Sequence, residues 1–305
     1  TGIEFQASEI YQNCPTEIDV LIAGNEIEGA DDAAIYCYTS WSSPGVGAVR
    51  KDTVIEDNYI HECDYGIYKY AYGEPAMAER GFTLIDNNIQ ATHAIYLSSS
   101  TIDGSGGSSS SDIQGQYDLI IEGNRIDGDY GGIYAYHYYS ESANTEVNAT
   151  IEKNDISSVG TGLYWGFSAY SYSDTPLEVN LSMRGNVLHN QGGYTNIYLS
   201  YHSTMVVSND LGSVEAFGYN TLLEPVTPAA PGAGLMGSSS GNTSVVFHSH
   251  ASSSMYYAEN NMVGNWWGTQ DAAEIEARVL HGGNGGEDGY PVDLSNPLPD
   301  SLDFT

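Results

Sequence analysis

The sequence predicts an all-β protein, a single-stranded right-handed parallel β-helix of about eight three-strand coils with a short C-terminal helix and loop cap. Two repeated motifs and the absence of any long helical pattern predict it. A core of the form apolar-x-x-Asn-x-apolar recurs six times, at 22–27 (IAGNEI), 55–60 (IEDNYI), 84–89 (LIDNNI), 121–126 (IEGNRI), 151–156 (IEKNDI) and 183–188 (MRGNVL). Two weaker copies follow at 217–222 (FGYNTL) and 257–262 (YAENNM), and the intervals are typical of solenoid repeats.

A second motif follows each of the first six copies at a nearly constant distance, at 34–36 (AIY), 66–68 (GIY), 94–96 (AIY), 132–134 (GIY), 162–164 (GLY) and 196–198 (NIY). A seventh copy is degraded to 234–236 (GLM). Alternating runs such as 146–151 (EVNATI) indicate a third strand in each period. Three short strands per repeat predict coils whose equivalent residues stack along a rod, ~4.8 Å apart.

The repeated asparagine has a structural explanation. An inward amide can donate to and accept from the coils above and below, and so satisfy buried polar groups. We therefore expect a structural ladder of Asn25, Asn58, Asn87, Asn124, Asn154 and Asn186.

The repeats assign residues 1–268 to one parallel β-helix and 269–305 to a capping segment, in which 271–281 reads as a helix. Insertions at 40–51, 72–81, 98–111 and 224–241 interrupt the coils as loops, where function would concentrate. The chain begins at 1–5 (TGIEF), as expected for a processed or excised chain, and this first strand has no cap of its own.

The charge is strongly negative, with 8 Lys+Arg against 40 Asp+Glu and a formal net charge of −32. This charge repels phosphate backbones and anionic lipid, so we expect no nucleic-acid partner. No apolar stretch is long enough for membrane insertion. The acidity is typical of a protein kept soluble in high salt, or of one that collects divalent cations on its surface. We predict no cofactor and no dedicated metal site, with calcium bound at most on the surface.

Tyrosine is the unusual component, with 25 Tyr against 6 Phe. If the isoleucine of each second motif points inward, strand alternation turns the next residue outward. This predicts an exposed row of Tyr36, Tyr68, Tyr96, Tyr134, Tyr164 and Tyr198, with a second row begun by Tyr38, Tyr70 and Tyr136. Such a face suits stacking on sugar rings or packing against another protein, while the same aromatics are also good strand formers.

On these repeats the chain resembles the right-handed parallel β-helix proteins of the pectate-lyase-like superfamily. The segment 265–268 (NWWG), with 274–279 (EIEARV) and 292–294 (VDL), resembles the segment that closes the last coil in many of them. The resemblance implies the fold, whereas the superfamily spans lyases, hydrolases, epimerases and adhesins. The paired aspartates of polygalacturonase-like hydrolases are not found in their usual Asn-Thr-Asp and Asp-Asp context, and the Asp-Pro-His motif of alginate epimerases is missing.

Lys69 is the candidate catalytic residue that this resemblance implies, since polysaccharide lyases of the fold use Lys or Arg to abstract a sugar proton. Its counterparts in other coils form an inward row of Cys37, Leu97, Ala135, Trp165 and Leu199. A lysine facing the core would need a partner or a lowered pKa. We expect instead a local bulge that turns Lys69 outward, where His61, Asp64 and Arg80 could assemble a site with it.

Two further features concern covalent chemistry. Cys14 and Cys37 follow corresponding strands of consecutive coils, which makes them a candidate disulfide, and Cys63 is the third cysteine. Sequons at Asn148, Asn180 and Asn242 are candidate glycosylation sites, the first two at equivalent outward positions of neighbouring coils.

These features lead to an extracellular structural or adhesive β-solenoid, secreted or at the cell surface. It would associate head-to-tail through its first strand or laterally through the tyrosines, into filaments or a surface layer. Two alternatives stay open: a lyase acting on an acidic or sulfated polysaccharide, and a non-catalytic carbohydrate-binding β-helix.

Overall fold

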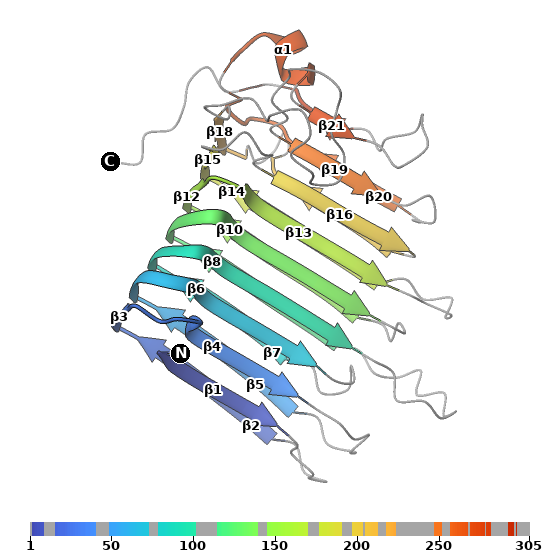
Figure 1. Ribbon diagram of the computed structural model, residues 1–305. Coiled ribbons are helices and arrows are strands. Elements are labelled where there is room, and N and C mark those ends of the chain that lie inside the picture. The colour runs from blue at the N-terminus through green and yellow to red at the C-terminus, as the bar shows by residue number, and fades with distance from the viewer. Residues whose placement is uncertain are drawn as a thin grey trace, which may run out of the picture.

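A computed structural model of the chain describes residues 2–8, 16–40, 49–72, 79–101, 115–139, 145–169, 177–190, 197–203, 205–212, 218–223, 247–251, 257–267, 269–277, 279–281, 292–295 and 297. These residues form a parallel β-solenoid, in which the strands of successive coils lie side by side along the rod (Figure 1). The fold class predicted from the repeats is confirmed.

The two sheets divide the strands between them. The first sheet, of 13 strands, follows the order β1 (Ile3–Ser8), β4 (Ala33–Ser40), β6 (Tyr59–Tyr72), β8 (Asn88–Thr101), β10 (Arg125–Tyr139), β13 (Thr161–Ala169), β16 (Ile197–Ser203), β19 (Phe247–Ala251) and β21 (Val279–His281). Its remaining members are the short strands β3 (Glu26–Glu28), β12 (Asp155–Ser158), β15 (Val187–Asn190) and β18 (Thr221–Leu223). The second sheet, of nine strands, follows the order β2 (Thr16–Ala23), β5 (Val49–Glu56), β7 (Glu79–Ile85), β9 (Gly115–Glu122), β11 (Thr145–Glu152), β14 (Leu177–Arg184), β17 (Met205–Asp210), β20 (Tyr257–Asn261) and β22 (Val292–Asp293).

Most of the described coils pass through three strand segments, as predicted. A strand of the second sheet leads into a short segment and then, after a corner, into a long strand of the first sheet, as in β2, β3 and β4. In β6, β8 and β10 the short and long segments are continuous, and the register shifts at the corner, between Ile60 and Cys63 and between Gly128 and Gly131. The loops predicted between coils lie largely outside the described residues. Strand β8, however, extends into the first residues of the loop predicted at 98–111.

The core consists of apolar rows that run along the rod. The middle of the long strands contributes Ile35, Ile67, Ile95, Ile133, Leu163 and Ile197, each at most 1% exposed. The other two segments contribute equivalent rows of Ile, Leu and Met, which pack into the same cluster. Because every coil buries its apolar side chains against its neighbours, the rod is stabilised along its whole length.

The asparagine ladder is confirmed, and Asn124 illustrates its geometry. Its Oδ1 accepts from the backbone N and the Nδ2 of Asn87, both at 2.9 Å. Its own N and Nδ2 donate to Oδ1 of Asn154 at 2.9 and 3.0 Å, and Nδ2 also donates to the Leu84 carbonyl at 3.0 Å. The six predicted asparagines repeat this linkage from coil to coil. Because these amides, apart from that of Asn25, are buried, their bonds replace water that the core excludes.

The backbone turns sharply just before each ladder asparagine. The preceding residue has a positive φ in every coil, including the non-glycine residues Asp57, Asp86, Lys153 and Tyr219. A left-handed residue costs an ordinary side chain about 1–2 kcal/mol. The turn is nonetheless kept, because it brings the amide of the next residue into the interior where its partners lie.

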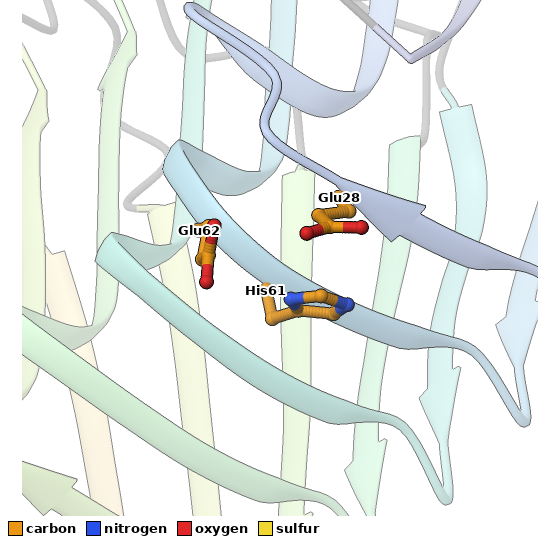
Figure 2. A group of neighbouring side chains, drawn as sticks. All are labelled: Glu28, His61 and Glu62. Atoms are coloured by element: carbon orange, nitrogen blue, oxygen red, sulfur yellow. The ribbon is translucent and has the colours of Figure 1, made fainter.

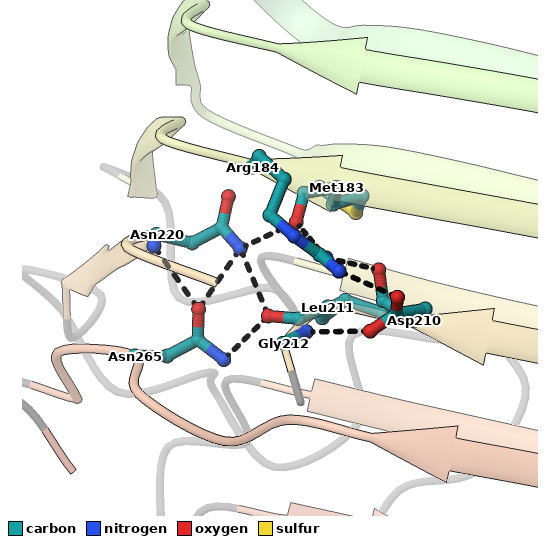
Figure 3. Close-up of polar contacts among 7 residues, drawn as sticks. All are labelled: Met183, Arg184, Asp210, Leu211, Gly212, Asn220 and Asn265. Carbon is teal, nitrogen blue, oxygen red and sulfur yellow. Dashed lines mark hydrogen bonds and ion pairs between the residues drawn. The ribbon is translucent and has the colours of Figure 1, made fainter. Parts of the chain in front are cut away.

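The ladder continues beyond the six predicted members, through Asn220 to Asn265 (Figure 3). The weak copy at 257–262 placed the last repeat asparagine at Asn260, which is wrong, because Asn260 lies in β20 opposite Asn209. Asn265 instead accepts from Asn220 Nδ2 at 2.9 Å and donates to the Leu211 carbonyl at 2.8 Å. The turn of this coil lies at Gly264, five residues later than the weak motif indicated.

The C-terminal segment departs from the predicted helix over 271–281. Helix α1 (Ala272–Ala277) has six residues and begins after Asp271, whose Oδ1 accepts from the backbone N of Ala273 at 2.9 Å. Ile275 packs into the core, and α1 lies at the C-terminal end of the rod (Figure 1). The last predicted helical residues form β21, which pairs with β19. Among the described residues, no helix is long and apolar enough to cross a membrane.

Candidate functional site: an uncharged tyrosine face

The outer side of the long strands carries the predicted tyrosine row. Strand register places Tyr36, Tyr68, Tyr96, Tyr134, Tyr164 and Tyr198 opposite one another from β4 to β16. Consecutive ring centroids lie 5.4, 5.0, 4.7, 4.6 and 5.3 Å apart. The row is therefore one continuous stack that spans six coils.

The ring orientation decides what a partner would meet. From Tyr68 to Tyr198 neighbouring rings are nearly parallel, with interplanar angles of 8° to 11°. The ring faces therefore lie against one another along the row, and the Tyr164 ring leans along its own strand, since its hydroxyl lies 3.0 Å from a Cβ placed on Gly166. A sugar ring has no free aromatic face to lie on in the middle of this row, which weakens the sugar-stacking interpretation.

The second row is shorter than the first. Tyr38 and Tyr70 stack at 5.9 Å, and strand register then places Ser98 between Tyr70 and Tyr136. Gly166 follows Tyr136 in this row, and a Cβ there would lie 2.7 Å from the ring of Tyr164 and 3.0 Å from that of Tyr136. The glycine therefore lets both rings lie flat across β13.

Aromatic residues at the corner widen this surface. Tyr65 packs edge-on against Tyr68 at 5.1 Å and stacks on His93 at 4.9 Å, and His93 in turn stacks on Tyr130 at 5.7 Å. Burial lowers the pKa of His93, and the nearby carboxylate of Asp64 partly offsets this effect. We call the outward surface of the long-strand segments 33–40, 65–72, 93–101, 131–139, 161–169 and 197–203, with its two tyrosine rows, the tyrosine face; the exposed carboxylates Asp64 and Asp129 lie beside it at the corner.

The tyrosine face is uncharged in a chain of net charge −32. The long-strand segments 33–40, 65–72, 93–101, 131–139, 161–169 and 197–203 contain no Asp, Glu or Arg, and their one Lys, Lys69, points inward. The outward side of the second sheet, here called the carboxylate face, holds Asp19, Asp52, Glu56, Asp118, Glu122, Glu146, Glu152, Glu178 and Asp210. The repeat thus separates neutral phenols and carboxylates onto different faces of one rod.

Partial burial raises the pKa of several of these phenols above the ordinary value near 10, so they stay neutral into the alkaline range. It is the main cause that raises the pKa of Tyr68 to about 12, and the neighbouring phenols of Tyr96 and Tyr36 add to it. Burial also raises the pKa of Tyr36, Tyr96 and Tyr134 above the ordinary value. At neutral pH the face therefore presents hydrogen-bonding hydroxyl groups without charge.

Lys69 lies inside the rod, so the predicted outward bulge is wrong. Its strand keeps register with Cys37 and Leu97, and the side chain is 2% exposed. The Nζ atom donates to the hydroxyl of Tyr117 at 2.6 Å and lies 4.6 and 4.3 Å from the ring centroids of Phe82 and Tyr117. Aromatic faces stabilise a desolvated ammonium, which explains how the core accommodates this lysine without a bulge.

Two of the residues proposed to act with Lys69, His61 and Asp64, are not brought to it. His61 and Asp64 lie on the outer side of β6, with Asp64 exposed, while Lys69 points into the core. The side chain of Arg80 lies outside the described part of the structure. A polymer on the outside of the rod cannot reach the Lys69 ammonium, so Lys69 does not share an accessible site with His61 and Asp64.

His137 is the interior residue that sequence reasoning missed. It is 1% exposed, shares a hydrogen bond through Nδ1 with the Ser99 hydroxyl, and stacks on Phe167 at 4.8 Å. Burial, and then the charge of Lys69, lower its pKa to about 3. Its place was available from the sequence, since it stands four residues after the inward Ile133 on the same strand.

A group of possible metal ligands lies at the corner between the short and long segments of the first coils. One ligand atom each from Glu28, His61 and Glu62 lies within 4.8 Å of the others (Figure 2). Register pairs Glu28 with His61, and the positive φ of Glu62 interrupts the alternation that would turn it away. Glu26 lies 3.8 Å from His61, and Tyr59 stacks on the same ring at 4.5 Å. Carboxylate and imidazole ligands suit a divalent cation, but both glutamates are exposed.

The covalent sites remain predictions. Cys37 is buried, and Cys14, its proposed disulfide partner, lies outside the described residues. Asn148 and Asn180 are paired in register on the carboxylate face, where Nδ2 of Asn180 donates to Oδ1 of Asn148 at 3.0 Å. Nδ2 of Asn148 donates to Asp118 at 3.2 Å, so both proposed glycan acceptors are engaged. Asn242 also lies outside the described residues.

The fold, the internal asparagine ladder and the external tyrosine row define the chain as a parallel β-helix repeat protein. Comparisons of the chain with protein families, with curated proteins and with solved structures found no match. Function is therefore inferred from the faces of the rod.

Proposed function

We propose that the protein is a structural or adhesive rod of an extracellular surface, which attaches to its partner through the tyrosine face. The single observation that carries the proposal is the uncharged, stacked tyrosine surface on a chain of net charge −32. A flat aromatic face with hydroxyl ends is typical of surfaces that dock another molecule.

Electrostatics support the choice of this face. Elsewhere an approaching neutral or acidic surface meets carboxylates, which keep their water and repel other carboxylates. On the tyrosine face it meets only phenols, serines and histidine, whose desolvation costs far less than that of ions. The distribution of charge therefore favours attachment through one side of the rod.

The enclosed position of Lys69 favours a non-catalytic rod over the lyase alternative within the pectate-lyase-like superfamily. A lyase of this fold needs a base that reaches the sugar proton on the outside. Incubation with alginate, pectate and sulfated polysaccharides tests this choice. Ultraviolet absorbance from unsaturated products, lost in a Lys69→Met variant, would favour the lyase.

Retention on surfaces tests the attachment. The panel consists of cellulose, chitin, pectate and beads that carry the chain itself, each at low and high salt. We expect wild type to bind at least one member and the Tyr96→Ser/Tyr134→Ser double variant to bind it at least about tenfold more weakly, as for loss of two central contact residues. Ile120→Ser, an exposed change on the other sheet, is the matched control. Equal retention of wild type and double variant on every member overturns the proposal.

A further inference from the structure

We propose that the occupant of the tyrosine face is a second copy of this chain, docked face to face with its rod axis reversed. The inference rests on the proposed function and names its partner. In this arrangement Tyr36 of one copy lies opposite Tyr198 of the other, and the middle of each row lies opposite itself.

The spacing of the row favours a second copy. Consecutive rings repeat every 4.6 to 5.4 Å over six coils, a spacing set by the strand separation of the solenoid. A partner must share this repeat to contact every ring edge in the same way. A second copy shares it by construction, and a two-fold axis in the plane of the face makes the two contact surfaces identical.

Charge favours the same partner. Two rods of net charge −32 repel each other in most orientations, with a range of about 8–10 Å at moderate ionic strength. Face-to-face docking brings together the two uncharged surfaces and leaves both carboxylate faces on the outside of the pair. This is therefore the approach of two copies that desolvates the fewest ions.

The area is sufficient for a stable contact. Six coils at ~4.8 Å and strand segments of about seven residues at ~3.3 Å give a flat face of roughly 700 Å². A standard interface buries about 800 Å² per partner, and the relief of the tyrosine side chains adds to the flat value. The face is thus of the size that a specific pair requires.

The ends of the row favour the reversed orientation. Strand register begins the row with Glu4 before Tyr36 and continues it with His248 after Tyr198. Glu4 is exposed, and its charge and that of Asp32 contribute to the raised pKa of Tyr36, so the first end is acidic. Docking with parallel axes would place Glu4 opposite Glu4. Reversal places each acidic end opposite the strand position of His248, which avoids this repulsion.

Sedimentation equilibrium tests the pairing. We expect wild type to form a dimer that high salt strengthens, because salt screens the repulsion between the rods. Tyr134→Glu, which places an unpaired carboxylate at the centre of the contact, should raise the dimer Kd by roughly a hundredfold or more. Ile120→Glu adds the same charge on the other sheet, outside the contact. Its dimer Kd should stay within about threefold of the wild-type value. Unfolding curves of both variants confirm that they fold.

Cross-linking tests the orientation in a Cys14→Ser background. Tyr36→Cys and Tyr198→Cys chains, mixed and treated with a short bis-maleimide, should link to each other at least about tenfold more than either links to itself, as an isologous reversed pair requires. Self-linking of Tyr36→Cys alone would show parallel axes and overturn the orientation.

A chain that stays monomeric at every salt concentration, while Tyr96→Ser/Tyr134→Ser still loses retention on a polysaccharide, overturns the second copy and leaves the proposed function standing. If the tyrosine variants lose neither dimerisation nor retention, both the second copy and the proposed function are overturned.

Discussion

Each coil contributes one asparagine to a row inside the rod. Six of the coils also contribute one tyrosine each to a row outside it. Inside, the amide groups hydrogen-bond to the coils above and below. Their hydrogen-bonding groups are therefore satisfied within the rod, and the row holds the turns in place. Outside, the rings stack on each other by their faces and are only half-buried, so the row stays open to the surroundings. The same repeat thus serves the fold in one row and contact with a partner in the other.

Removing an inner amide should have the largest effect on stability. Asn124→Ala leaves two donors of Asn87 and the buried carbonyl of Leu84 without their partner. Each unsatisfied buried group costs about 1–3 kcal/mol, so we expect a loss of roughly 3–5 kcal/mol in the free energy of unfolding. Urea denaturation followed by circular dichroism measures it.

Asn25→Ala is the matched control, because Asn25 is the half-buried first member of the described ladder and donates to Asn58. We expect it to lose only about 1 kcal/mol, the usual net contribution of a hydrogen bond that water can replace. Equal losses in the two variants would contradict the argument that burial makes the inner row essential.

Acid should destabilise the rod through its interior. His137 has a folded-state pKa of about 3, below the ordinary value near 6.5, so between these values only the unfolded chain binds the proton. The free energy of unfolding therefore falls as pH drops below about 6.5, by about 1.4 kcal/mol per pH unit from this group.

His137→Phe should remove that contribution, since phenylalanine keeps the packing against Phe167 and does not titrate. Urea unfolding at pH 7 and pH 4.5 gives the difference for wild type and variant. His189→Phe, on the short strand β15, controls for the loss of a histidine. A variant that keeps the full acid sensitivity of wild type would show that His137 is not its cause.

The sequence predicted the repeating parts of both rows and failed where a single coil departs from the repeat. Period and alternation were enough for the asparagines and for the tyrosine row, because neighbouring coils repeat the same environment. Lys69 was misplaced because its aromatic partners come from other strands, Phe82 from β7 and Tyr117 from β9, which local spacing does not reveal. Glu62 was missed because its positive φ breaks the alternation.

The C-terminal coil failed for a related reason. Residues 217–222 hold the seventh ladder asparagine, but the following insertion left the eighth repeat without a clear pattern, and its asparagine was placed at Asn260 instead of Asn265. Residues Val279–His281 fit a helical pattern but pair with β19, since an exposed strand edge offers them a full set of backbone partners. Tertiary pairing there prevailed over local propensity.

Removing an outer ring should cost much less stability than removing an inner amide. Tyr134→Thr loses the ring stacks with Tyr96 at 4.7 Å and Tyr164 at 4.6 Å and keeps a β-branched residue on the strand. A cross-strand aromatic pair contributes about 0.2–1 kcal/mol, so we expect a loss of about 1 kcal/mol. Urea unfolding of Tyr134→Thr beside Asn124→Ala checks it. Losses of equal size would mean that the tyrosine row serves the fold rather than a partner.

An alkaline effect is also expected, and it reports on the phenols of the tyrosine face. The folded-state pKa of Tyr68 is about 12, above its ordinary value near 10, so above pH 10 the unfolded chain releases a proton that the folded chain keeps. Stability from Tyr68 is therefore complete below about pH 10 and is lost as pH rises toward 12.

Titration of the tyrosinate absorbance should show late-ionising phenols in the folded chain, and Tyr68→Phe should reduce their number. Tyr219→Phe, an exposed phenol away from the face, is the control for the loss of one tyrosine. If Tyr68→Phe and Tyr219→Phe change the late part of the titration equally, the stacked row does not hold its phenols neutral, and the contrast between a closed inner row and a neutral outer row fails.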